Sequence, residues 1–260
     1  MDLRDKVDIT YICKLSGEFI EKEKQEFVDL FNTVFHTNYS LEWFNWKYID
    51  NIYGDSYIVL AYDEGQLIGI RAFWRNDIED HLSYQPCDTA VLKSHRGKGI
   101  FTKSSKLALE KTKGAFIYNF PNENSLPGNL KLGWRINKYS YLKPVLSKSK
   151  LKDETDYIDD NYLVWRFTKS PIKKYYYYQK NGESYLLFNR GRNIYYVLGR
   201  FNNEYNDYFI KVDFPILFSY TTKETIIYKI FNNRGTVVSF NNGIEGTDKI
   251  YIPEYKADYF

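Results

Sequence analysis

The sequence predicts an α+β fold followed by a β-rich C-terminal region. Strand and helix patterns alternate up to about residue 145, a basic loop with two glycines joins a strand to a helix at residues 92–103, and from about residue 157 the chain reads almost wholly as strands and turns. The chain has 260 residues, enough for one large domain or two small ones, and its 43% hydrophobic and 27% charged content is ordinary for a globular protein.

The first elements follow from the spacing of apolar residues. Residues 8–15 alternate as a strand, and residues 18–35 place phenylalanine, isoleucine and leucine side chains at helical spacing. Ser40 stands where an N-cap would begin a helix over 41–49. Residues 56–74 read as two strands joined by a turn at Asp63-Glu64-Gly65.

The next elements surround the glycine loop. They are a strand over 84–94, a helix over 101–113, a short buried strand over 115–120, and a helix over 122–133 that is interrupted by Pro127 and closes at Gly133, with a further strand region after it. Residues 146–161 are charged and weakly patterned, so we expect a first domain at 1–148 and a β-rich second domain at 149–260.

Two stretches of the chain resemble each other. Residues 41–60 align with 161–179, so that Trp46-Lys47 falls on Trp165-Arg166, and each pair is followed by a turn and a strand. Either the second domain is a degenerate duplicate of the first, or the aromatic-basic pair recurs by chance. No second glycine-basic loop follows the second pair.

Composition excludes several classes of function. A net charge of +3 gives no general basic field, so nucleic acid is not expected as a partner. The cysteines, Cys13 and Cys87, form no C-x-x-C pair, and the three histidines share no ligand spacing, so neither a disulfide nor a metal site is predicted. No apolar run approaches the ~20 residues of a membrane span, and the N-terminus lacks signal-peptide features, which predicts a cytoplasmic protein.

The 26 tyrosines concentrate in the second half, for example at 173–180. Tyrosine favours strands, and it also stacks on ring-bearing ligands such as a nucleotide base or a sugar. Both interpretations remain open at this point.

The glycine loop is suited to a phosphate group. A strand followed by a glycine loop and a helix directs free amide groups and the positive end of the helix dipole at one point. Glycines allow close approach of the backbone, and Lys93, Arg96, Lys98 and Lys103 add positive charge. The spacing is neither that of a Walker A loop nor G-x-G-x-x-G.

Arg96-Gly97-Lys98-Gly99-Ile100 resembles the acetyl-CoA signature of the GNAT acetyltransferase superfamily, R/Q-x-x-G-x-G/A, with Phe101 standing where that signature has Gly or Ala. A second family frame, N-x-x-A-x-x-L-Y-x-x-x-G-F, follows downstream. Asn122, Gly133 and the aromatic Trp134 match it, Ser125 is a small substitute for its alanine, and Asn129 replaces the tyrosine that many members use as a general acid. The resemblance covers residues 5–145 and implies the GNAT fold, a mixed, mostly antiparallel twisted sheet flanked by helices.

The resemblance also implies a cosubstrate, acetyl-CoA or another acyl-CoA. Two strands would splay apart around its pantetheine arm, and the loop amides would hold its pyrophosphate. The residues implied in CoA binding are Thr89, Ala90, Val91, Leu92, Arg96, Gly97, Lys98, Gly99, Ile100, Phe101, Thr102, Asn122 and Ser125. The large ring of Phe101 would press on the pyrophosphate or shape the adjacent pocket.

Acyl transfer to an amine requires a neutral amine, so a base must remove a proton. Asp88, one step before the implied CoA stretch, is the first choice, and His81 is placed on the acceptor side. Tyr139 or Tyr141 would replace the missing acid, although positioning alone is an alternative. A mechanism through an acylated Cys87 is not expected. No histidine stands at motif distance from Cys87, and a lone cysteine in a strand is usually a buried apolar residue.

The sequences of residues 44–73, 88–103, 120–125 and 132–134 resemble those of bacterial GNAT proteins of surface-polysaccharide synthesis. This implies an acyl-CoA-dependent N-acyltransferase acting on a small-molecule amine, a nucleotide-linked amino sugar. The alternatives are the same chemistry on a peptide, an antibiotic or a cell-wall precursor, and a CoA-binding module without catalysis.

Overall fold

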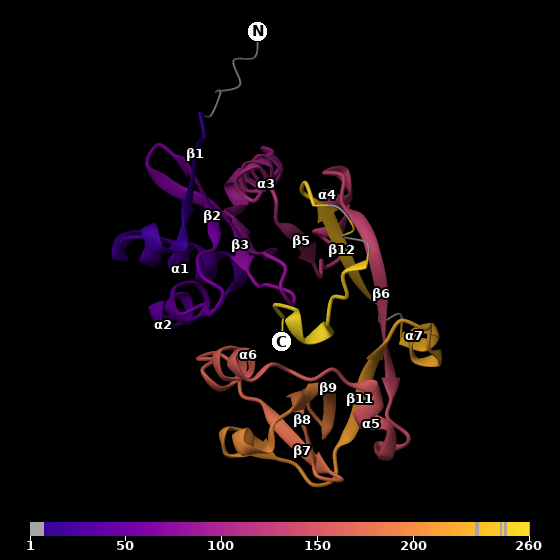
Figure 1. Cartoon of the computed structure of the whole chain (residues 1–260). Coiled ribbons are helices and arrows are strands. Elements are labelled where there is room, and N and C mark those ends of the chain that lie inside the picture. Colours follow the sequence, from indigo (N-terminus) through magenta and orange to yellow (C-terminus); the bar gives the residue numbers. More distant parts are fainter. Residues whose placement is uncertain (1–7, 232–233, 245, 247–248, 260) are drawn as a thin grey trace. The chain divides into compact units, whose positions relative to one another are not determined.

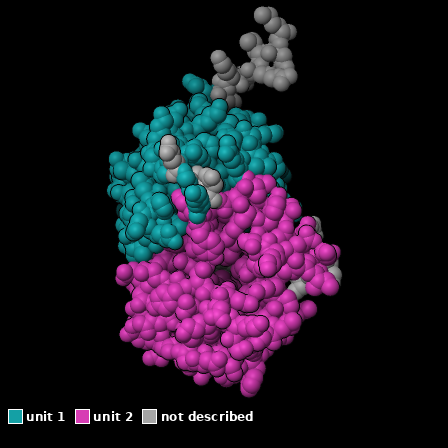
Figure 2. All heavy atoms as spheres, turned by 45° about the vertical axis from the view of Figure 1, so that its right-hand side comes forward, with its two compact units in different colours: residues 1–119, 123–135, 239–249 teal, residues 120–122, 136–238, 250–260 magenta. Residues whose placement is uncertain are grey.

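The computed structural model describes residues 8–231, 234–244, 246 and 249–259. The chain forms two compact units (Figure 2), of which the first comprises residues 1–119, 123–135 and 239–249 and the second 120–122, 136–238 and 250–260. Residues 136–148, which the sequence analysis assigned to the first domain, therefore lie in the second unit. In the described residues, no helix is long and apolar enough to cross a membrane.

The first unit has the expected order of helices and strands (Figure 1). They are β1 (Thr10–Leu15), α1 (Glu21–Phe35), α2 (Leu41–Phe44) with a π-helical turn (Asn45–Ile49), β2 (Tyr57–Asp63), β3 (Gln66–Arg75), β4 (Ser83–Val91), α3 (Ile100–Lys111), β5 (Phe116–Asn119) and α4 (Leu126–Lys131). The strands are ordered β1-β2-β3-β4-β5, antiparallel except for the parallel pair β4–β5. Ser40 lies at the N-cap of α2, but its side chain makes no capping hydrogen bond.

The helices pack on the sheet through their apolar stripes. α1 packs against β3 and β4 through a stripe that includes Phe27 and Phe31, and α3 packs against β2 and β3. Alternation along β3 sends Gly69 and Arg71 toward α3, whereas the Trp74 indole donates to the carbonyl of Lys47 in the π-helical turn, 3.1 Å away. One strand thus presents different side chains to the two helical layers.

Strands β4 and β5 share two residue pairs, Ser83 with Phe116 and Tyr84 with Ile117. Beyond these pairs β4 continues to Val91 without a further pair to β5 in the described residues. The two strands therefore part, as the resemblance implied, and leave one side of the end of β4 outside the ladder.

A β-bulge interrupts β4 in the same stretch. Ile70 pairs with Ala90 and Ala72 pairs with Cys87, so Asp88 and Thr89 together stand opposite the single residue Arg71. Asp88 has a φ of 44°, in the left-handed region that non-glycine residues seldom adopt. Such a bulge leaves a residue unpaired in the ladder and redirects the side chains beside it.

The second unit has more helix than the sequence analysis predicted. It holds most of β6 (Arg135–Pro144), α5 (Leu151–Glu154), α6 (Asp160–Leu163) with a π-helical turn (Val164–Thr168), β7 (Tyr176–Lys180), β8 (Glu183–Asn189), β9 (Ile194–Phe201), β10 (Ile210–Lys211), β11 (Ile216–Thr221) and α7 (Ile226–Phe231), while β12 (Arg234–Asn241) runs from it into the first unit. The strands of this unit are ordered β6-β11-β9-β8-β7-β10. The prediction of almost only strands and turns is wrong at α6 and α7. Asp159 caps α6 by accepting a hydrogen bond from the Tyr162 amide. The β-forming residues in these segments had favoured strands in the sequence-based prediction.

The two units repeat one topology. Each has a short helix extended by a π-helical turn, then three antiparallel strands, then a strand parallel to the third. The pairs Trp46-Lys47 and Trp165-Arg166 occupy corresponding π-helical turns, and β9 has a register shift where β4 has its bulge. This favours duplication over chance recurrence. Between β9 and β11 lie a 3-10 helix, Asn203–Tyr208, and β10 in place of a glycine loop and α3.

Candidate functional site

The glycine loop after β4 forms an open cradle of amide groups at the start of α3. Gly97 and Gly99 have φ angles of 79° and 77°, and a Cβ on either would meet no atom within 4 Å. The glycines therefore serve the left-handed backbone, and the space beside them is open. In the described chain, no carbonyl outside α3 accepts from the amides of residues 97–102. The 12-residue α3 adds its dipole, so the loop can hold an anion.

The basic side chains of the loop differ in their surroundings. The Arg96 Nε donates to the carbonyl of Val91 at 3.2 Å, and the Lys103 Nζ lies 4.3 Å from the Tyr11 ring centroid. Lys98 and Thr102 are exposed. The His95 Nε2 lies 2.9 Å from an Asp63 oxygen, so this ring is held by the hairpin turn between β2 and β3. Of these cations, Lys98 and Arg96 are the ones whose charge is available beside the cradle.

The Phe101 ring lies beside Gly128 and Arg71. Its ring edge lies 2.7 Å from the place of a Cβ on Gly128 of α4, and its ring centroid lies 4.2 Å from the Arg71 guanidinium carbon. The ring fills the space that Gly128 leaves and supports Arg71. Its neighbour Ile100 is buried against Ala61 and Ile68. The departure at Phe101 is thus matched by a glycine on the facing helix.

Arg71 is a buried cation beside the bulge that the sequence analysis did not single out. It is 3% exposed, and its Nη1 donates to the Thr89 Oγ1 at 2.7 Å. Its Nε and Nη2 have no hydrogen-bond partner within the described structure. Burial lowers the pKa of this guanidinium to about 10, and Cys87 opposes the shift. A lone cation inside the apolar stretch QLIGIRAFW was the signal that could have revealed it.

Asp88 lies in a buried ion pair on the other side of the bulge. Its Oδ2 is 2.8 Å from the Lys47 Nζ, with 4% and 6% of the lysine and aspartate side chains exposed, and the Tyr48 hydroxyl donates to the same oxygen. The lysine also lies over the Trp74 ring, 5.1 Å from its centroid. The Cys87 Sγ is 3.7 Å from the Tyr48 hydroxyl. The sequence analysis had noted Lys47 only as part of a repeat, and it had missed Tyr48.

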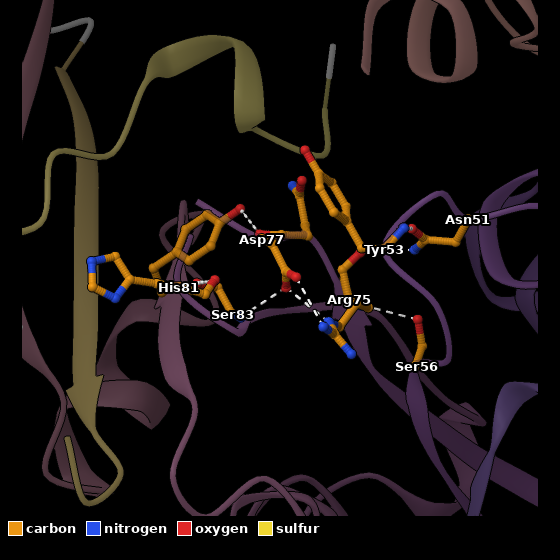
Figure 3. Close-up of polar contacts among 9 residues, drawn as sticks. Asn51, Tyr53, Ser56, Arg75, Asp77, His81 and Ser83 are labelled. Carbon is orange, nitrogen blue, oxygen red and sulfur yellow. Dashed lines mark hydrogen bonds and ion pairs between the residues drawn. The ribbon is translucent and has the colours of Figure 1, made fainter. Parts of the chain in front are cut away.

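His81 occupies the turn between β3 and β4. Figure 3 shows its ring directed away from the Arg75–Asp77 pair, and its carbonyl accepts from the Ser83 hydroxyl at 2.8 Å. Asp77 binds the Arg75 Nε and Nη2 at 2.8 and 2.9 Å and accepts from the Ser83 amide at 2.9 Å. The turn is held by these contacts, and none among the described residues joins His81 to Asp88.

The remaining predicted CoA residues lie on β4 and before α4. Ala90 and Val91 pair with β3, and the Leu92 amide donates to the Ile68 carbonyl at 2.9 Å. The Ser125 carbonyl accepts from the Asn129 amide at 3.0 Å. Asn122 is exposed and belongs to the second unit, whereas the loop belongs to the first.

The structure also places Asn129, which stands at the position of the family's general acid, and the two tyrosines considered as substitutes. Asn129 is fully buried, and its side-chain amide has no hydrogen-bond partner in the part described. Tyr139 packs under the Arg234 guanidinium and Tyr141 against Tyr228, all in the second unit. These contacts are packing contacts.

Solved structures of low sequence identity share the fold. A protein from Enterococcus faecalis described as a probable N-acyltransferase is 12% identical with a TM-score of 0.57, covering 90% of this chain and 73% of that one. A GCN5-related N-acetyltransferase from Kribbella flavida is 7% identical with a TM-score of 0.54 over 91% and 72%. One from Anabaena variabilis is 10% identical with a TM-score of 0.52 over 89% and 72%. No family model and no curated protein sequence matches the chain. The likeness establishes the GNAT fold over most of the chain and confirms the predicted fold class.

Proposed function

We propose that this chain, which has the fold of the GNAT N-acetyltransferases, transfers an acyl group from a CoA thioester to an amine. The observation that carries the proposal is the open amide cradle of Gly97 and Gly99 at the start of α3, directly after the strand that parts from its neighbour. In the net reaction an N–C bond forms, the C–S bond breaks, and one proton passes from nitrogen to sulfur.

The donor set fits the phosphates of CoA. Amide groups and a helix N-terminus favour an anion of high charge, and Lys98 and Arg96 add positive charge at the rim. The end of β4, from Thr89 to Leu92, offers backbone groups on the side that has left the ladder. These residues would hold an extended, amide-containing arm as a neighbouring strand is held. When bound, the thioester supplies the activated acyl group.

Asp88 remains our choice for the base that removes the amine proton. Lys47 and Tyr48 both contact its Oδ2, which fixes the orientation of the carboxylate, and the residue lies in the bulge, in the part of β4 that pairs with β3 but no longer with β5. Asp88 and its two partners therefore act as one unit in this proposal, with Lys47 and Tyr48 as positioning residues.

The acceptor in this proposal is the amine of a nucleotide-linked amino sugar. The only support for this acceptor is the sequence resemblance to bacterial GNAT proteins of surface-polysaccharide synthesis. In the second unit, Tyr178, Tyr185 and Tyr195 are buried in an apolar cluster, so packing accounts for these members of the tyrosine-rich set. A peptide, an antibiotic or a cell-wall precursor would use the same chemistry.

Release of CoA thiol from acetyl-CoA tests the activity. The purified chain is incubated with acetyl-CoA and a panel of nucleotide-linked amino sugars, free amino sugars and peptides, and calorimetry measures CoA binding in parallel. Thiol release with a nucleotide sugar supports the proposal, and release with another amine corrects the acceptor. Binding without turnover on any amine identifies a CoA-binding module, and no binding at all refutes the proposal.

A further inference from the structure

One edge of the buried Arg71 guanidinium has a hydrogen-bond partner, and the other has none among the described residues. Its Nη1 is bound by Thr89, while Nε and Nη2 have no hydrogen-bond partner within the described residues. Nε and Nη2 form a fork that matches the two oxygens of a carboxylate. Arg75, four residues along the same strand, shows this fork filled: its Nε and Nη2 bind the two oxygens of Asp77 at 2.8 and 2.9 Å.

Two buried guanidinium donors without an acceptor destabilise the folded state. Arg71 is 3% exposed and packs on the Phe101 ring, and burial of an arginine without a counter-ion is unfavourable because charged donors lose their hydration. Packing alone does not require a charged residue at this place, because an apolar side chain would contact Phe101 and Phe73 without that cost. A ligand carboxylate would satisfy both donors and the charge.

We propose that Arg71 is the receptor for a carboxylate group carried by a substrate, and that the acyl donor is the CoA thioester of a dicarboxylic acid. This rests on the proposed function. Arg71 stands opposite Asp88 and Thr89 in the bulge, and Thr89 begins the stretch of β4 assigned to the thioester arm. A carboxylate at the far end of a short acyl chain would lie beside that stretch. A carboxylate on the amine acceptor has the same chemistry, and the experiment separates the two.

Calorimetry on the full chain tests the donor. The probes are CoA, acetyl-CoA and succinyl-CoA, and the proteins are the wild type and Arg71→Met. We expect the wild type to bind succinyl-CoA about 10- to 100-fold more tightly than acetyl-CoA, the range of a charge-assisted hydrogen-bonded pair. Arg71→Met should lose this preference and keep its affinity for CoA. Arg75→Met is the matched control: it removes a filled fork from the same strand and should leave the preference unchanged.

Kinetics test the acceptor. If the carboxylate belongs to the amine, Arg71→Met raises the KM for amino acids but not for their methyl esters, and the succinyl-to-acetyl ratio stays the same as in the wild type. The carboxylate-receptor role of Arg71 is refuted if the wild type binds CoA but prefers neither succinyl-CoA over acetyl-CoA nor amino acids over their methyl esters. That result leaves the proposed function standing. An equal fall in kcat for all donors and acceptors also overturns it. If no CoA thioester binds, both proposals fail.

Discussion

The ammonium of Lys47 and the carboxylate of Asp88 form an ion pair of 2.8 Å that is almost wholly withdrawn from solvent. The pair connects the π-helical turn after α2 to the bulge of β4, and the Tyr48 hydroxyl joins it at the same oxygen. A strand bulge and a helical irregularity that lie 40 residues apart in sequence are thereby fixed to each other. This relationship sets the geometry of the proposed base.

Asp88→Asn tests the energetic weight of this pair. Asparagine keeps the shape but removes the carboxylate charge that faces the buried lysine ammonium, which should lower the free energy of unfolding by about 3–5 kcal/mol in urea titrations. The double variant Lys47→Met with Asp88→Asn removes both charges and should be more stable than Asp88→Asn alone. Equal stability of the two would show that the ammonium is not held by this carboxylate.

Gly99→Ala tests the anion cradle. The alanine meets no atom but must adopt a φ of 77°, which costs about 1–2 kcal/mol, and any relaxation moves the amides of the cradle. We expect weaker CoA binding in calorimetry as well as lower stability. Gly65→Ala is the control, because Gly65 has a φ of 81° and open space in the hairpin between β2 and β3. Equal loss of CoA affinity in both variants would count against the cradle.

Gly128→Ala tests the contact between α3 and α4. The new Cβ would lie 2.7 Å from the Phe101 ring, an overpacked contact that should cost about 1–3 kcal/mol in the free energy of unfolding. In a Phe101→Ala background the same change should be stabilising, because alanine is about 1 kcal/mol better than glycine in a helix and the ring is gone. The comparison is made by thermal and urea unfolding. The same sign in both backgrounds would contradict the packing described.

Cys13 gives a prediction about pH. Burial raises the pKa of its thiol from 9.0 to about 11, with Lys111 opposing and Glu18 reinforcing the shift. In the unfolded chain the thiol ionises near pH 9, so its contribution to stability is complete below pH 9 and is lost as the pH rises through about 11. Cys13→Ser should therefore lose less stability between these two pH values than the wild type. The measurement is urea unfolding at each pH. If the free energy of unfolding falls equally with pH in the wild type and in Cys13→Ser, the thiol has no such role.

The sequence alone predicted most of the first unit because its signals are local. Apolar spacing gave α1, the turn at Gly65 gave the hairpin, and the two loop glycines gave the cradle at the start of α3. The second unit was harder, because α6 has only four residues and runs directly into the β-forming residues of the turn Val164–Thr168. Its helical start depends on the Asp159 cap. The repeat of Trp46-Lys47 at Trp165-Arg166 was visible, but only the matching strand topology favours duplication over coincidence.

By itself the sequence determined the α+β class and the glycine loop at the start of α3, because glycine conformation, helix starts and apolar periodicity act over a few residues. The tertiary structure decided which side chains meet at the bulge. Register across β3 and β4 sets Arg71 opposite Asp88 and Thr89, and helix packing brings Lys47 to Asp88 and Phe101 to Gly128. Such contacts join residues distant in the chain, and their burial makes the charges at the bulge energetically significant.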